Sequence, residues 1–188
     1  MTDKKNRPWL YLLIAAAFVA VDQLSKWLVV VFLKPVGSVT LIGLPAVLQR
    51  LLGKTDFLRL TYLENRGAAF GSFSEHRWVF MIFSTVAIVG VIVYLLRFAE
   101  NNRLLRWTLA LIIGGGVGNM IDRVALGYVV DFIDFCGIWS YIFNVADSCV
   151  CIGAGMLVLY CILGMCDEMK EQKNKPTEPP ADGNGGTA

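Results

Sequence analysis

Long apolar runs dominate the chain, and their spacing predicts its fold. Four runs, at residues 9–33, 79–96, 104–121 and 146–165, each approach the roughly 20 apolar residues that a membrane-spanning helix needs. Charged residues make up only 17% of the chain and gather between these runs. A soluble helix carries a polar stripe along one side, and residues 79–96 have none. The pattern therefore predicts an all-α integral membrane protein with four transmembrane helices rather than a soluble helical bundle.

The first apolar run has the basic start of a secretory signal peptide but not its other features. It is longer than the apolar core of such a signal, and no small-residue cleavage site follows it. It also contains two charged residues, Asp22 and Lys26. We therefore expect residues 9–33 to form the first transmembrane helix.

The distribution of basic residues predicts the orientation of the helices, because cytoplasmic loops carry an excess of Lys and Arg. The loop of residues 34–77 also holds six basic residues, but a loop of this length can fold as a small domain and weaken the rule. We expect both termini in the cytoplasm and residues 34–77 outside. The basic residues that favour this orientation are Lys4, Lys5 and Arg7, then Arg97, Arg103 and Arg106, and finally Lys170, Lys173 and Lys175.

The outer loop has the character of β-structure. Residues 38–42 are short, apolar and β-branched, and residues 56–64 alternate roughly between apolar and polar side chains. Residues 127–133 are a candidate third strand, and residues 46–52 a candidate short helix at the membrane interface. These segments predict a small extracytoplasmic β-sheet, with strands in the outer loop of residues 34–77, that rests on the helices.

The chain is expected to form one four-helix membrane domain, residues 1–168, followed by a tail. Residues 169–188 are rich in Pro, Gly, Glu and Asn, which predicts a disordered cytoplasmic tail. No internal repeat is visible, and this argues against transporters built from inverted repeats.

Carboxylates gather where the third and fourth apolar runs meet a polar loop. Ionisable groups at a membrane boundary are costly to hold there and mark function by default. Asp131 and Asp147 are the best candidates for a reacting pair, because each stands at a boundary beside an apolar residue. Two carboxylates held close together share a proton, so one can take a proton from water while the other donates to a scissile carbonyl. Asp134 is the rival for Asp131, and we interpret it as a solvated loop charge.

Other polar residues are candidates for support or substrate binding. Asp22 and Lys26 share one helix face in the favoured order, and form either a structural ion pair or a brace for the outer acids. Lys26 is also close enough to the outer end to extend toward the membrane surface. Asn65 precedes small residues that begin at Gly67. It either belongs to an ordinary turn or binds the backbone of a substrate.

The third apolar run ends in a further group of polar residues. Asn119 and Asp122 share a helix face, and Arg123 lies about 100° round the helix from Asp122. Arg123 can pair with a neighbouring carboxylate or reach a lipid phosphate. Asn144 lies on the same helical edge as Asp147, and the glycines before Asn119 favour close helix packing.

The histidine and cysteine content excludes several kinds of site. The chain has one histidine, His76, so neither a catalytic triad built on histidine nor a histidine-rich metal site can form. The five cysteines lack the spacing of metal ligands and read as small buried apolar residues. A disulfide between Cys136 and Cys149 is an open alternative. We expect no metal and no other cofactor.

Five motifs in this order resemble those of the bacterial lipoprotein signal peptidase family, signal peptidase II. The resemblance runs from the first apolar run to the fourth, and it is specific because all five motifs occur in sequence on matching helices. The motifs are Asp22-Gln23-Leu24-Ser25-Lys26, Asn65-Arg66-Gly67-Ala68-Ala69-Phe70, Gly115-Gly116-Val117-Gly118-Asn119-Met120-Ile121-Asp122-Arg123, Val130-Asp131-Phe132 and Phe143-Asn144-Val145-Ala146-Asp147.

The resemblance implies a membrane aspartic endopeptidase of the bacterial cytoplasmic membrane, with its active site at the outer face. Such an enzyme removes signal peptides from prolipoproteins, cutting before a cysteine that carries diacylglycerol. Its partners would be these prolipoproteins and membrane lipids but no nucleic acid, and we expect a monomer. Asp131 and Asp147 match the catalytic dyad of the family. The other motif positions are matched by Asp22, Asn65, Asn119, Asp122, Arg123 and Asn144.

The chain departs from the family pattern at two places. Arg66 stands where the family often has threonine, which can alter a lipid or peptide contact, and an insert at residues 43–55 lengthens the first outer loop. Two other functional classes fit the pattern less well than the peptidase. A small membrane carrier or proton-coupled channel would spread its acids through the membrane depth, whereas here all but Asp22 lie near the outer ends. A metal-dependent phosphohydrolase would need more basic phosphate ligands than Arg123.

Overall fold

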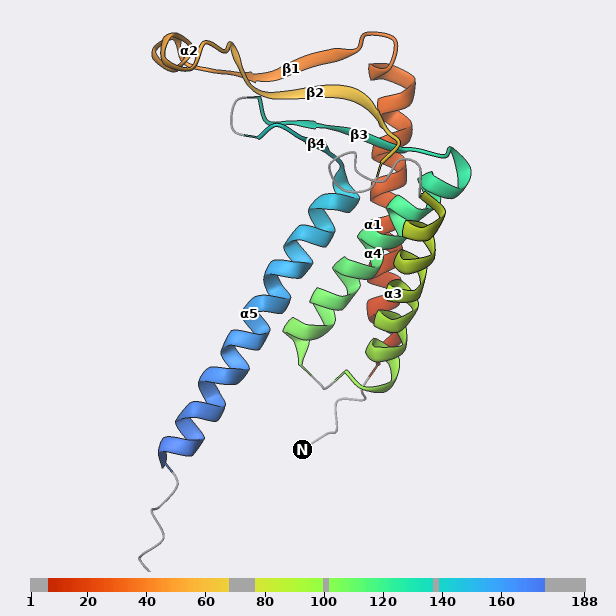
Figure 1. Ribbon diagram of the computed structural model, residues 1–188, viewed down its shortest axis with the longest axis vertical. Coiled ribbons are helices and arrows are strands. Elements are labelled where there is room, and N and C mark those ends of the chain that lie inside the picture. The colour runs from red at the N-terminus through yellow and green to blue at the C-terminus, as the bar shows by residue number, and fades with distance from the viewer. Residues whose placement is uncertain (1–6, 68–76, 100–101, 137–138, 175–188) are drawn as a thin grey trace, which may run out of the picture.

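The computed structural model describes residues 7–67, 77–99, 102–136 and 139–174, and shows a group of helices with a small sheet at one end (Figure 1). The start of the first helix and the end of the last lie at the opposite end from the sheet. The helical segments are α1 (Trp9–Leu28), its π-helical continuation η1 (Val29–Leu33), α2 (Ala46–Leu52), α3 (Arg77–Arg97), α4 (Arg103–Ala125) and α5 (Val145–Asn174).

Among the described residues, three helical segments are long and apolar enough to cross a membrane: Trp9–Leu33, Arg103–Ala125 and Val145–Asp167. A fourth apolar segment, Met81–Arg97 in α3, is shorter. The apolar runs thus correctly predicted where the helices lie, while the count of four membrane spans stays a prediction. Helix α5 continues beyond the predicted end at residue 165 to Asn174. Residues 175–188 lie outside the described part of the chain, so the disordered tail stays a prediction.

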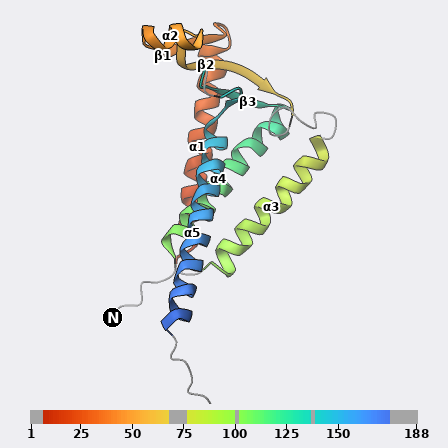
Figure 2. The same cartoon turned by 60° about the vertical axis from the view of Figure 1, so that its left-hand side comes forward.

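Helix α4 packs closely on its neighbours because glycines form its surface there. A methyl group built at Gly114 would lie 2.8 Å from Cβ of Phe18 in α1, and one at Gly118 would lie 2.6 Å from Oδ2 of Asp22. Gly115 faces α5 in the same way. Figure 2 shows α3 on the far side of α4 from α5. The expectation of close packing at this glycine run is confirmed, and α4 is the helix that the others surround.

The strands form one antiparallel sheet in the order β1-β2-β3-β4. Their bounds are Ser38–Gly43 for β1, Asp56–Asn65 for β2, Val129–Asp134 for β3 and Ile142–Phe143 for β4. The first three strands and the short helix α2 were predicted from the sequence, whereas the two-residue β4 was not. In the register of β2 and β3, Leu63 lies opposite Asp131 and Arg59 opposite Asp134.

The sheet is attached to the helices by an apolar cluster between η1 and β3. Val29 and Leu33 of η1 pack against Val130 and Phe132 of β3, and all four are buried. Burying such side chains contributes about 1.5–3 kcal/mol each relative to leaving them exposed. This contact sets β3 across the end of α1 and fixes the place of Asp131 between two buried apolar residues.

The outer end of the sheet has a different character. Helix α2 begins after Pro45 and ends at Leu52, and the left-handed conformation of the following Gly53 (φ 64°) is typical of a residue that terminates a helix. Val47 and Leu51 lie one turn apart on α2 and are 78% and 77% exposed. Such an exposed apolar edge is consistent with a position at the membrane interface. The interfacial position of residues 46–52 stays a prediction.

Candidate active site

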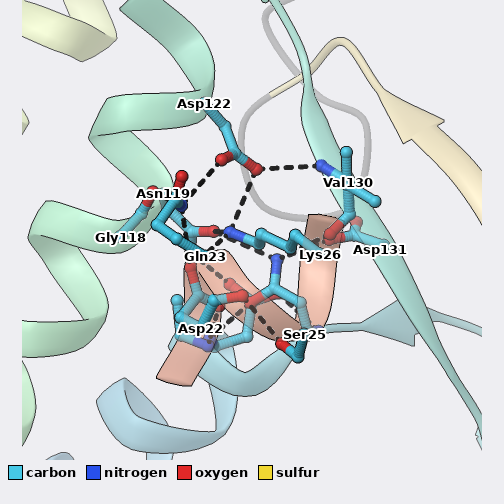
Figure 3. A network of polar contacts seen from close by, with 12 residues as sticks. Asp22, Gln23, Ser25, Lys26, Gly118, Asn119, Asp122, Val130 and Asp131 are labelled. Carbon is cyan, nitrogen blue, oxygen red and sulfur yellow. Dashed lines mark hydrogen bonds and ion pairs between the residues drawn. The ribbon is translucent and has the colours of Figure 1, made fainter. Parts of the chain in front are cut away.

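A buried polar cluster lies where α1, α4 and α5 meet β3 (Figure 3). Asp131 is 1% exposed and Asn144 is fully buried. Throughout the described residues, every buried side-chain nitrogen or oxygen has a hydrogen-bond partner. The structure thus brings together sequence-predicted residues from α1, α4, β3 and the start of α5: Asp22, Lys26, Asn119, Asp122, Asp131, Asn144 and Asp147.

Asp147 lies in the first turn of α5, where a reciprocal cap holds it. Oδ1 of Asn144 accepts a hydrogen bond from the backbone N–H of Asp147 at 2.8 Å, and Oδ2 of Asp147 accepts one from the backbone N–H of Asn144 at 3.3 Å. Asn119 donates from Nδ2 to Oδ1 of Asp147 at 2.7 Å. These donors and the positive end of the helix stabilise negative charge on Asp147.

Asp131, on β3, is held by two asparagine amides. Asn144 donates from Nδ2 to its Oδ1 at 2.7 Å, and Asn65 donates from Nδ2 to its Oδ2 at 2.9 Å. Burial and then the charge of Asp147 raise the pKa of Asp131 from the ordinary value of 3.8 to about 7, while the two amides and Lys26 oppose that rise. The Asn144 side chain therefore contacts both residues of the predicted pair, through Nδ2 to Asp131 and through Oδ1 to the backbone of Asp147.

Lys26 is enclosed by acceptors. Its Nζ lies 2.8 Å from Oδ2 of Asp22 and 3.0 Å from Oδ2 of Asp122, and it donates to Oδ1 of Asn119 at 3.1 Å. The Lys26 side chain is 4% exposed, so the prediction that it extends to the membrane surface is wrong. The alternative of an Asp22–Lys26 ion pair is confirmed. Because an unpaired buried charge is very costly, the three charged residues depend on one another.

Asn65 forms a turn as well as a contact with the site. Its Oδ1 accepts a hydrogen bond from the backbone N–H of Gly67 at 3.1 Å, while its Nδ2 points to Asp131. The turn interpretation is therefore confirmed, and both ends of the amide are engaged within the protein. Residues 68–70 of this motif lie outside the described residues.

Arg123 extends along α4 beside the site. It is half-buried, and its Nη1 donates to the backbone oxygen of Asn119 at 3.2 Å. This places the guanidinium next to the residue that binds Asp147. Its predicted contact with lipid phosphate stays a prediction.

Asp134 was wrongly interpreted as a solvated loop charge. It is the last residue of β3, is 8% exposed, and forms an ion pair of 2.8 Å with Nη2 of Arg59. Thr61 donates to the same carboxylate oxygen at 3.1 Å. Burial acts to raise the pKa of Asp134, but the Arg59 and Thr61 hydrogen bonds outweigh it and hold the pKa below its usual value. Asp134 is part of the outer sheet rather than of the buried cluster.

The cysteines are all free, so a disulfide between Cys136 and Cys149 is not formed. His76 lies outside the described residues. Within the described ranges, no group of three or more His, Cys, Asp and Glu side chains is placed to hold a metal ion. The cluster acids instead direct their oxygens at N–H groups and at Lys26.

Gln23 is the site residue that sequence reasoning missed. Its Nε2 donates to Oδ1 of Asp122 at 2.9 Å and to the backbone oxygen of Gly118 at 3.1 Å, which joins α1 to α4. Its place between Asp22 and Lys26 in the first motif was a usable signal. The Asn144-x-x-Asp147 spacing of a helix cap was also readable from the sequence.

Comparison with known proteins identifies the family. The model of the family described as signal peptidase (SPase) II matches residues 14–163. The chain belongs to the signal peptidase II family. It is 43% identical over 146 residues to the lipoprotein signal peptidase of Caldanaerobacter subterraneus subsp. tengcongensis, covering 78% of this chain and 91% of the relative. It is 37% identical over 169 residues to that of Halalkalibacterium halodurans, covering 88% and 98%.

A solved structure has a similar fold. The fold is similar to a bacterial membrane enzyme determined by the in meso method at 2.3 Å resolution, with a TM-score of 0.67, 28% identity, and coverage of 90% of this chain and 94% of that one. The family predicted from the five motifs is therefore confirmed. A signal peptidase II is a protease that processes prolipoproteins, and the apolar helices fit an integral membrane protein.

Proposed function

We propose that this signal peptidase II is an aspartic endopeptidase in which Asp131 and Asp147 activate a water molecule. Its substrates are prolipoproteins that carry diacylglycerol on a cysteine, and it cuts the signal peptide immediately before that cysteine. The observation that supports this best is the position of Asn144, whose side chain binds the Asp131 carboxylate and the backbone of Asp147 at once. Two acids joined through one small side chain are suited to share a proton.

The environments of the two acids suggest a division of roles. Asp131, with a pKa of about 7, holds the shared proton and donates it to the oxygen of the scissile carbonyl. Asp147, whose carboxylate accepts hydrogen bonds from the Asn119 amide and from the backbone N–H of Asn144, takes a proton from water as the water oxygen attacks the carbonyl carbon. When the tetrahedral intermediate collapses, Asp147 returns that proton to the leaving amine. Asp131 recovers its own from the hydroxyl group that becomes the new carboxylic acid.

The arrangement of the helices supports an active site at the outer membrane face. The cluster lies at the sheet end of the helices, and the start of α1 and the end of α5 lie at the other end (Figure 1). Arg97 ends α3 and Arg103 begins α4, and these two helix ends lie away from the sheet (Figure 1). We therefore place the termini in the cytoplasm, with four spans in the bacterial cytoplasmic membrane and a monomeric enzyme.

A lipid anchor would solve the problem of delivering a peptide bond to this depth. The anchored substrate is already confined to the membrane, so less translational entropy is lost when it is positioned at the dyad. Arg123 lies beside the cluster and is suited to a lipid headgroup. An apolar groove between α3 and α4, lined in part by Ile88, Val117, Ile121 and Val124, can take an acyl chain.

The test uses purified protein with one prolipoprotein in two forms, with and without diacylglycerol on the cysteine. We expect cleavage of the lipidated form at least about a hundredfold faster, a part of the advantage available from positioning. Mass spectrometry should show a product that begins at the lipidated cysteine. The Asp147→Asn variant should give no product, while Asp167→Asn, on the same helix but far from the cluster, should cut normally. Equal cleavage of both forms, or full activity of Asp147→Asn, would contradict the proposal.

A further inference from the structure

We propose that Lys26 is a positioning residue that holds the Asn119 and Asn144 side chains and the backbone around Asp131 and Asp147 in the geometry that the reaction needs. The inference rests on the proposed dyad and adds how that dyad is built. It is carried by the contacts of a buried ion triad formed by Asp22, Lys26 and Asp122 (Figure 3).

Each acid of the triad accepts a hydrogen bond from the backbone N–H of the residue that precedes a dyad acid. Oδ1 of Asp22 accepts a hydrogen bond of 2.8 Å from the backbone N–H of Ala146, the residue before Asp147. Oδ2 of Asp122 accepts one of 3.1 Å from the backbone N–H of Val130, the residue before Asp131. The triad acids thus tie α1 to the start of α5 and α4 to β3, one residue from each reacting carboxylate.

Lys26 links these two backbone contacts, because its Nζ forms an ion pair with both Asp22 and Asp122. Removal of its charge would leave Asp22 and Asp122 buried as two like charges in one cluster. Such charges repel, and they would relax by taking up a proton or by moving apart. Either change would shift the backbone that carries Asp131 and Asp147.

Lys26 also determines which way the Asn119 amide faces. An asparagine side chain has an oxygen that accepts and a nitrogen that donates, and reversal exchanges the two. A lysine ammonium group has donors only, so the amide atom 3.1 Å from Nζ of Lys26 must be the oxygen. The nitrogen of Asn119 is thereby directed at Oδ1 of Asp147.

The orientation of Asn119 is passed on to Asn144. The nitrogen of Asn144 donates to Oδ1 of Asn119 at 3.0 Å, to the Val130 carbonyl at 3.3 Å and to Oδ1 of Asp131 at 2.7 Å. Because all three are acceptors, the oxygen of Asn144 must face the backbone N–H of Asp147, as observed. A single buried ammonium group therefore sets the direction of both amides, and each amide donates to one acid of the dyad.

The charged groups around the dyad make this role measurable. Within the described part of the chain, the charged groups around the dyad are Asp22 and Lys26 from α1 and Asp122 and Arg123 from α4. Burial raises the pKa of Asp131, and the positive charge of Lys26 opposes that rise. Loss of Lys26 should therefore move the alkaline limb of the pH–kcat profile to higher pH, which a purely structural defect would not do.

The experiment measures kcat, KM and the pH–kcat profile with a diacylglyceryl-modified prolipoprotein. The test variants are Lys26→Met and the double variant Lys26→Met/Asp122→Asn, which removes one of the two uncompensated acids and keeps an acceptor for Val130. The control is Lys34→Met, which removes an exposed lysine paired with Glu64. We expect the test variants to lose about tenfold to a hundredfold in kcat with KM changed less than about threefold. The control should match the wild type in rate and pH profile.

Each other result would overturn the proposal. A folded Lys26 variant with nearly full kcat would show that the amides keep their orientation without it. A lower kcat with an unmoved alkaline limb, or loss of the fold in both test variants, would assign Lys26 to the fold alone. Activity in Asp131→Asn and Asp147→Asn would instead contradict the dyad. If both of those are inactive while the Lys26 variants cut at full rate, only the positioning role fails.

Discussion

Two acids on one strand, Asp131 and Asp134, have opposite properties although only two residues separate them. Both are buried, at 1% and 8% exposure. The pKa of Asp131 is raised to about 7, by burial first and then by the neighbouring Asp147, while that of Asp134 is held below its usual value because Arg59 and Thr61 outweigh the effect of burial. Burial alone therefore does not decide the proton affinity of an acid in this molecule.

The difference lies in the partners that each end of β3 meets. The Asp131 end rests on the helices, where neutral amides are the nearest donors and a second acid lies close by. The Asp134 end lies in the sheet, opposite Arg59. A neutral donor holds a carboxylate without neutralising its charge, so Asp131 can exchange a proton near neutral pH, whereas Asp134 stays an anion in an ion pair.

Apart from changes to the dyad acids and to Lys26, we expect the largest effect on activity for Asn65→Ala. This change removes one of the two amides that favour the anion of Asp131, so the pKa of Asp131 should rise further. We expect kcat to fall about tenfold and the alkaline limb of the pH–rate profile to move upward. Asn102→Ala is the matched control, since Asn102 caps α4 through Leu105. It should cost about 1 kcal/mol of stability and little activity. A full rate in Asn65→Ala would mean that Asn65 serves only its own turn.

The raised pKa of Asp131 should also make the stability of the protein depend on pH. The folded protein binds a proton at Asp131 more tightly than the unfolded chain does, so its contribution is fully present below pH 3.8 and is lost as the pH rises through about 7. A shift of roughly 3 pKa units corresponds to about 4 kcal/mol at most. The difference in unfolding temperature between wild type and Asp131→Asn should therefore decrease, to the disadvantage of wild type, as the pH rises from 3.8 to about 7. A constant difference would place the pKa of Asp131 near its ordinary value.

Chelation should have the smallest effect. The carboxylate oxygens of the cluster are engaged by N–H groups and by Lys26, which leaves them poorly suited to bind a metal ion. We expect the cleavage rate to be the same with and without EDTA. A loss of rate that zinc or magnesium restores would favour a metal-dependent hydrolase and weaken the role of both dyad acids.

The apolar runs and the motifs predicted much of this fold. Hydrophobic length alone locates α1, α3, α4 and α5 because the bilayer constrains helices so strongly. Alternation and turn residues also located β1, β2 and β3. The two-residue β4 carries too little pattern to be found, and the end of α5 was misplaced because polar composition does not by itself end a helix.

The site was harder to predict, because its contacts join residues far apart in the chain. Spacing suggested the Asp22–Lys26 pair, but that Asp122 closes the pair into a triad depends on how α1 packs against α4. The partner of Asp134 depends on the register of β2 against β3, which the sequence did not specify. Asp134 and Lys26 were both wrongly predicted to lie at the surface. Each is buried because it pairs with a residue that is far away in the sequence but close in the structure.

The most direct test compares Asp131→Asn with Asp134→Asn, made and purified together and assayed on the same diacylglyceryl-modified prolipoprotein. Asp131→Asn should remain folded and lose at least about a thousandfold in kcat, because the change removes the proposed proton donor. Asp134→Asn should keep kcat within about threefold of wild type. Its unfolding temperature should fall, because the partly buried ion pair with Arg59 is broken. An inactive Asp134→Asn beside an active Asp131→Asn would contradict the account and would assign the reacting carboxylate to the other end of β3.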